Sequence, residues 1–153
     1  MRQIDDTATS VAAQMLAQGT LGVATRGPGF TDLTRDVAGW LAGIGAADGV
    51  VTLFVRHTSA SLLIQENADP DVQLDLVEAL RRLAPEASTY LHNSEGPDDM
   101  PAHIKAMVMP VSLTIPVACG TMRLGTWQGI YLVEHRTRPH LREIALHYSG
   151  SIA

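Results

Sequence analysis

Strand-like segments fill the C-terminal third of the chain and constrain its fold more than any other feature. Residues 111–117, 121–126 and 129–134 are rich in apolar and β-branched side chains, and in residues 141–148 Ile144, Leu146 and Tyr148 alternate with polar or smaller neighbours. Such alternation is typical of a strand with one solvent-exposed face. Because strands joined by short turns usually pair antiparallel, these segments predict a mainly antiparallel sheet.

The first two thirds of the chain carry three helical patterns. Five apolar residues at helical spacing predict an amphipathic helix, capped by residue 31 or 32: Leu33, Val37, Trp40, Leu41 and Ile44. Asp69 followed by Pro70 is a typical helix start, and the helical period continues up to Pro85. A third, short helix is expected over residues 102–109, between two prolines.

Further strands are expected between these helices. Residues 20–25 and 61–65 read as short strands, and the continuous apolar run 50–55 predicts a strand buried on both faces. The order of elements therefore predicts an α+β fold, in which two or three helices pack against a mainly antiparallel β-sheet or sandwich.

The length of the chain favours a single domain. The 153 residues suit one hydrophobic core, which we assign to residues 20–153. Residues 1–19 are expected to form an N-terminal extension, because Val11, Met15 and Leu16 show only a weak helical pattern that ends at Gly19. The sequence shows no signal-peptide pattern and no run of about 18 apolar residues, so we expect a cytoplasmic protein without membrane association.

Charge and cysteine content exclude several kinds of partner and site. The formal net charge is −5, with no dense block of lysine and arginine, which argues against nucleic acid as a partner. The single cysteine, Cys119, rules out an internal disulfide and an all-cysteine zinc site. We expect Cys119 to fill space beside an apolar strand.

A first polar cluster follows the apolar run 50–55. It consists of Arg56, His57, Thr58 and Ser59, and the end of a strand is a rigid place from which to project a histidine and two hydroxyls. In the alternative interpretation, the hydroxyls satisfy backbone groups of a turn and the histidine is solvated.

A second polar cluster occupies residues 92–103. It contains His92 and His103 together with three carboxylates, and imidazole and carboxylate are ligands of zinc and manganese. The spacing matches neither the HExxH motif nor an EF-hand loop. In the alternative interpretation this is a solvated loop, in which Asp98 or Asp99 caps the following helix.

A third cluster surrounds residues 125–136. Trp127 and Gln128 lie between glycines and could stack on and hydrogen-bond a heteroaromatic ring, or form an ordinary bend with a core tryptophan. Glu134 ends an apolar strand, so we expect it to be buried with a partner or held for chemistry. The remaining histidines are interpreted as surface residues: His135, His140 and His147.

Taken together, four motifs resemble the YjbQ family, which is named for a secondary thiamine-phosphate synthase activity. They are HTSAS at 57–61, ENADP at 66–70, DDMPAHIK at 98–105 and GTWQGI at 125–130, within a resemblance that covers about residues 20–150. The resemblance implies a compact α+β domain, a homotrimer, and a polar pocket that draws on the motif residues between subunits. It also implies an activity that joins an aminopyrimidine diphosphate to a thiazole phosphate and releases pyrophosphate.

The resemblance and the polar clusters together lead to a hypothesis for the site. A divalent metal ion, with zinc as the first candidate, would be held by His57, His92 and His103. The residues expected to act in catalysis are His57, Ser59, Asp99 and Glu134, of which Asp99 or Glu134 would orient a ligand histidine or act as general base. The residues expected to bind a small phosphorylated substrate are Arg56, Thr58, Asn67, Lys105, Trp127 and Gln128.

Two other functions fit the same residues. The protein could be a small-molecule or metal-binding module without physiological catalysis, or it could use a metal ion to hydrolyse a phosphate or ester. Turnover that depends on metal would favour an enzyme, and tight binding without turnover would favour the module.

Overall fold

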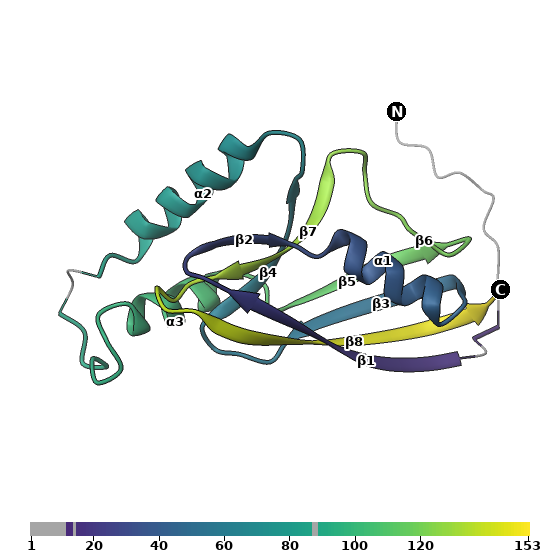
Figure 1. Ribbon diagram of the computed structural model, residues 1–153, viewed down its shortest axis with the longest axis horizontal. Coiled ribbons are helices and arrows are strands. Elements are labelled where there is room, and N and C mark those ends of the chain that lie inside the picture. Colours follow the sequence, from purple (N-terminus) through teal and green to yellow (C-terminus); the bar gives the residue numbers. More distant parts are fainter. Residues whose placement is uncertain (1–11, 14, 87–88) are drawn as a thin grey trace, which may run out of the picture.

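The structure, a computed structural model, describes residues 12–13, 15–86 and 89–153. The described residues form eight strands and three helices, whose arrangement is drawn in Figure 1. In chain order these are β1 (Met15–Thr25), β2 (Gly29–Asp32), α1 (Thr34–Gly43), β3 (Ala46–Val55), β4 (Ala60–Glu66), α2 (Pro70–Leu83), α3 (Asp99–Val108), β5 (Ser112–Ala118), β6 (Thr121–Met122), β7 (Gln128–Glu134) and β8 (His140–Ile152).

The strands form two sheets. A five-stranded sheet has the order β1-β8-β3-β5-β6, and a three-stranded sheet has the order β2-β7-β4. All the pairs that make up these sheets are antiparallel. The predicted α+β class with a mainly antiparallel sheet is therefore confirmed.

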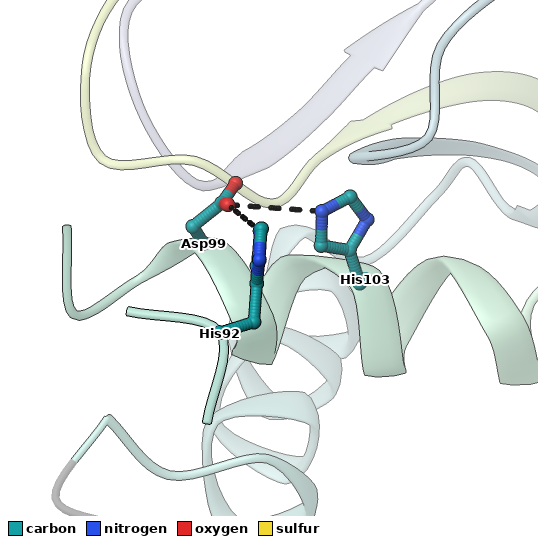
Figure 2. Close-up of side chains that lie close together, drawn as sticks. All are labelled: His92, Asp99 and His103. Atoms are coloured by element: carbon teal, nitrogen blue, oxygen red, sulfur yellow. Dashed lines mark hydrogen bonds and ion pairs between the residues drawn. The ribbon is translucent and has the colours of Figure 1, made fainter. Parts of the chain in front are cut away.

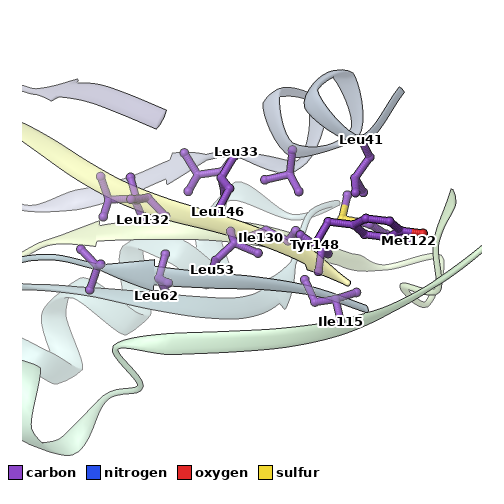
Figure 3. Packing of buried hydrophobic residues seen from close by; sticks show 14 of the residues in the cluster. Leu33, Leu41, Leu53, Leu62, Ile115, Met122, Ile130, Leu132, Leu146 and Tyr148 are labelled. Atoms are coloured by element: carbon purple, nitrogen blue, oxygen red, sulfur yellow. The ribbon is translucent and has the colours of Figure 1, made fainter. Parts of the chain in front are cut away.

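The hydrophobic core is enclosed by both sheets and by α1 (Figure 3). In β3, Val51, Leu53 and Val55 are buried, whereas Val50 and Phe54 are 37% and 48% exposed. The prediction that residues 50–55 are buried on both faces is therefore wrong. An antiparallel sheet can leave one face open to solvent, and in β3 that open face still carries apolar side chains.

Strand β1 begins earlier than the sequence predicts. Met15 and Leu16 lie in a strand that pairs with β8 from Met15↔Gly150 to Thr25↔His140, so the helical pattern expected there is wrong at these two residues. The long strand β8 offers backbone partners over this whole length, and those ladder hydrogen bonds override a weak helical period. Val11 lies outside the described residues, and the expected boundary between residues 19 and 20 falls inside β1.

The helices occur where predicted, with one shift that matters for the site. The side chain of Asp69 caps α2 by accepting a hydrogen bond from Asp71 N, and Asp32 Oδ1 accepts one from Thr34 N at the start of α1. Helix α3 begins at Asp99 rather than at residue 102. Helix α2 projects from the body of the protein (Figure 1), and none of its side chains is fully buried.

Two further findings concern single features of the chain. Cys119 is exposed, with a φ of 49°, so the expectation that it fills space beside a strand is wrong; the residue belongs to the turn that joins β5 to β6. In the described part of the chain, none of the helices has the length and apolar character needed to span a membrane.

Candidate functional site

Two histidines and one aspartate converge at the start of α3 (Figure 2). His92 lies in the loop before the helix, Asp99 is the first helical residue, and His103 follows one turn later. Asp99 Oδ2 is 2.7 Å from His92 Nε2 and 3.7 Å from His103 Nε2. One ligand atom from each of the three residues lies within 4.8 Å of the others.

The orientation of His103 is set by a backbone carbonyl. Its Nδ1 is 3.1 Å from Thr58 O, and because a carbonyl oxygen only accepts hydrogen bonds, Nδ1 carries the proton. The lone pair of Nε2 is then free on the side of Asp99. Metal-binding histidines commonly donate their second ring N–H to a carbonyl or carboxylate in this way. Thr58 therefore contributes through its main chain.

His92 is held differently. Its Nε2 donates to Asp99 Oδ2, since an ionised carboxylate can only accept. A cation bound at this nitrogen would require the proton to leave or to move to Nδ1. The side chain of His92 is 46% exposed and that of Asp99 is 3% exposed, so the carboxylate is fixed inside the protein and His92 faces solvent.

The donor set of this group fits a divalent transition metal. Two imidazoles and one carboxylate form a common catalytic zinc set, which leaves a fourth position for water or substrate. The same donors also accept other divalent ions. The chemistry of the donors therefore agrees with the predicted metal, although Asp99 rather than His57 completes the group.

His57 lies near this group but does not join it. Its Nε2 accepts a hydrogen bond of 2.8 Å from Glu143 N. Burial lowers the pKa of His57, and the positive charge of Arg142 adds to the effect, which favours the neutral ring. Only two of the three histidines predicted to bind metal are brought together.

An open pocket adjoins the candidate metal-binding group of His92, Asp99 and His103, called the metal group below. Its volume is about 810 Å³, and His103 forms part of its wall. Its polar lining residues include Arg56, His57, Thr58 and Ser59, and its apolar lining residues are Phe54, Val55, Ala106, Met107 and Val111. Arg56 forms an ion pair of 3.1 Å with Glu143. The first polar cluster of the sequence therefore lines one pocket together with a metal-ligand candidate.

Glu134 is buried with a partner, which is the first of the two alternatives that the sequence leaves open for this residue. Its carboxylate accepts five hydrogen bonds, from the Thr25 hydroxyl, the main-chain N–H groups of His135 and Arg136, and two nitrogens of Arg142. Burial alone would raise the pKa of Glu134, but these bonds outweigh it and lower the pKa. Ser59 Oγ accepts from Arg142 as well. Ser59 and Glu134, two of the four predicted catalytic residues, are thus engaged in internal contacts.

His135 is not a surface residue, which corrects the sequence interpretation. It is 2% exposed, and its Nε2 is 2.8 Å from Ser61 Oγ. Burial lowers its pKa to about 4, and the positive charge of Lys105 contributes. His135 directly follows β7, and its contact with Ser61 of β4 depends on the tertiary fold, which local sequence does not reveal. His140 and His147 are half-buried.

Four residues predicted to bind substrate do not line the open pocket: Lys105, Asn67, Trp127 and Gln128. Lys105 lines a small hollow together with Glu134 and His135, and burial lowers the pKa of Lys105. Asn67 Nδ2 donates to Gln128 O, and Trp127 is 65% exposed. Gln128 is part of the last pair, Glu66↔Gln128, at one end of the β4–β7 ladder, and Asn67 and Trp127 lie just beyond that end, whereas Ser59 lies just beyond the Ala60↔Glu134 end. Six residue steps separate these ends, or about 20 Å.

One residue that contacts the metal group, Arg136, is not indicated as a site residue by any sequence pattern. Arg136 follows β7, and its guanidinium binds Asp99. Its position two residues after the buried Glu134 is a signal for an ordered side chain, but the contact with residue 99 depends on the tertiary fold.

The low pKa of His135 predicts an acid-dependent loss of stability. The folded protein holds this pKa at about 4, whereas the unfolded chain titrates near about 6.5. Below a pH of about 6.5, protons therefore bind the unfolded state in preference to the folded one. At a pH of about 4, this one residue should have lowered the free energy of unfolding by about 3 kcal/mol. Urea denaturation of the wild type and H135Q over this range gives the contribution as a difference. Identical pH dependence in both proteins would contradict it.

Comparison with known proteins confirms the resemblance. A family model described as UPF0047 protein YjbQ-like matches residues 19–151. UPF0047 protein sll1880 of Synechocystis is 46% identical over 145 residues, which cover 94% of this chain and 99% of that protein. UPF0047 protein YjbQ of Salmonella typhimurium is 40% identical over 137 residues, 89% of this chain and 99% of that protein. The crystal structure of hypothetical protein APE1520 from Aeropyrum pernix is similar with a TM-score of 0.82 at 33% identity, covering 88% of this chain and 99% of that one. The chain belongs to the YjbQ-like UPF0047 family.

Proposed function

We propose that this protein is a metal-dependent enzyme that acts on a small phosphorylated molecule. The observation that carries the proposal is the group of His92, Asp99 and His103, whose ligand atoms lie within 4.8 Å of one another. The hydrogen bond from His103 Nδ1 to Thr58 O supports it, because that bond leaves Nε2 free for a metal.

The residues around this group have separate tasks in the proposed reaction. A divalent ion bound there would neutralise negative charge on a phosphate oxygen as a Lewis acid. Arg56 and the neutral His57 line the adjoining pocket and would bind other oxygens of the substrate. Phe54 and Met107 also line that pocket and are 48% and 77% exposed, and they would pack against an organic ring.

The specific reaction that we propose is a thiamine-phosphate synthase-type condensation. In it the bond between the aminopyrimidine methylene carbon and its diphosphate breaks, a bond from that carbon to the thiazole nitrogen forms, and pyrophosphate leaves. The proposal rests on the family resemblance and on a pocket beside the metal group whose lining includes Arg56 and several apolar side chains. Charge neutralisation on the leaving pyrophosphate is the contribution that these residues are suited to make.

A binding module without catalysis is the second candidate. It is favoured by the state of Glu134 and Ser59, whose side chains accept hydrogen bonds from Arg142 inside the protein. A carboxylate that accepts five hydrogen bonds is poorly placed to take up a proton from a substrate. In this interpretation the metal and the pocket would hold a ligand and release it unchanged.

Metal content is the first test. Protein loaded with zinc and dialysed should retain about one ion per chain, and H103A and D99N should lose it, because each removes one of three ligands. H147A is the matched control, since His147 is a half-buried histidine of β8 outside the group. Elemental analysis by mass spectrometry measures all four proteins. Wild-type protein without retained zinc would refute the metal site.

Catalysis is tested separately with the metal-loaded protein. Formation of thiamine phosphate from the two phosphorylated precursors should fall at least about 100-fold in H103A and stay unchanged in H147A. Tight binding of either precursor without product would support the binding module. Release of phosphate from simple esters, with no condensation product, would support a metal-dependent hydrolase instead.

We further propose that the protein is a homotrimer in which one subunit completes the site of the next. The separation of about 20 Å between the two ends of the β4–β7 ladder supports this, because it keeps Trp127, Gln128 and Asn67 away from His57 and Ser59 of the same chain. If all these residues bind one substrate, some of them must come from a second copy.

Complementation between inactive variants tests the shared site. Sedimentation velocity should give about three times the chain mass of 16.4 kDa. H103A and W127A should each be inactive alone, and trimers reassembled from both should regain activity, because some sites then combine an intact His103 with an intact Trp127. Mixed trimers that stay inactive, or a monomeric protein, would contradict the proposal.

A further inference from the structure

Arg136 connects three parts of the chain around the metal group. Its side chain is 11% exposed and lies in the segment after β7. Nε donates to Asp98 Oδ2 at 3.0 Å, Nη2 donates to Glu95 O at 2.9 Å, and Nη1 binds Asp99 Oδ1. The guanidinium therefore holds the loop before α3 and the first turn of α3 against the end of β7.

These contacts divide the two oxygens of Asp99 between different partners. Oδ1 is bound by Arg136, while Oδ2 lies between His92 and His103. We infer that Arg136 is a positioning residue of the metal site, which restricts Asp99 to one metal-facing oxygen. This inference rests on the proposed function, because it concerns the same three ligands.

The same arrangement explains why the neighbouring Asp98 is outside the group. Its Oδ2 accepts three hydrogen bonds, from Arg136 Nε and from the N–H and hydroxyl of Thr137. Asp98 is 6% exposed, so its carboxylate is held inside the protein by these donors. Of two adjacent aspartates, one is used to anchor the helix and the other faces the histidines.

Single-oxygen binding by Asp99 has a chemical consequence. Three ligand atoms from three side chains leave a position open for water or substrate, as in catalytic zinc sites. A carboxylate that bound through both oxygens would occupy part of that space. Lysine could not reproduce the effect, because its ammonium group lacks the planar set of donors that reaches two carboxylates and a carbonyl together.

The test compares R136K with T137A, using Co²⁺ as a spectroscopic probe. R136K keeps the charge and loses the fork of donors, so the dissociation constant for Co²⁺ should rise about tenfold or more and the visible absorption spectrum should change with the coordination number. T137A removes one hydrogen bond to Asp98 and none to Asp99, so its affinity and spectrum should match those of the wild type.

Each outcome separates this inference from the proposed function. Wild-type protein that binds no Co²⁺ would overturn both. If the wild type binds Co²⁺ and R136K keeps the same affinity and spectrum, the role of Arg136 is overturned and the proposed function is not. Equal losses of Co²⁺ affinity in R136K and T137A would have the same meaning. If R136K does not fold, a crystal structure of the metal-loaded wild type decides: Asp99 bound through Oδ2 with Arg136 on Oδ1 supports the inference, and chelation by both oxygens overturns it.

Discussion

The buried ion pair between Glu134 and Arg142 joins the two sheets of this protein. Glu134 ends β7 in the three-stranded sheet, Arg142 lies in β8 of the five-stranded sheet, and two of their atoms are 2.6 Å apart. Thr25 at the end of β1 donates to the same carboxylate. Burying two charges is costly, and removing one partner of such a pair typically costs about 3–5 kcal/mol, because the other charge is left uncompensated. The five hydrogen bonds to Glu134 are what make this burial tolerable.

Both sides of the metal group depend on this pair. On one side, Arg142 binds the carbonyl and hydroxyl of Ser59, which fixes the segment whose preceding residue, Thr58, accepts the hydrogen bond from His103. On the other side, Glu134 Oε1 accepts the main-chain N–H of Arg136 at 2.8 Å, and the side chain of Arg136 then binds Asp99. One buried carboxylate thus connects to the metal group through two separate chains of contacts, one ending at His103 and the other at Asp99.

The sequence predicts the elements of this protein better than it predicts which side chains meet. Hydrophobic period and local signals such as Asp69-Pro70 involve neighbouring residues only, so the helices and most strands follow from them. The metal group depends instead on where α3 begins. Because the helix starts at Asp99, that residue lies one turn before His103 and on the same face, and it takes the place predicted for His57. The contact of the buried His135 with Ser61 of β4 depends on the tertiary fold, which no local pattern encodes.

The two chains of contacts from Glu134 also change how a substitution at this residue should be interpreted. A general base would act on the substrate directly, and its loss would leave the metal group intact. In this structure the loss of Glu134 would release Arg142 from its ion pair and the main chain of Arg136 from its acceptor, so ligands on both sides of the metal group would lose support. Loss of activity on substitution of Glu134 is therefore expected for a positioning residue too, and metal affinity is the quantity that separates the two roles. Loss of a general base would leave the metal affinity unchanged, whereas loss of a residue that positions Asp99 and His103 would weaken that affinity.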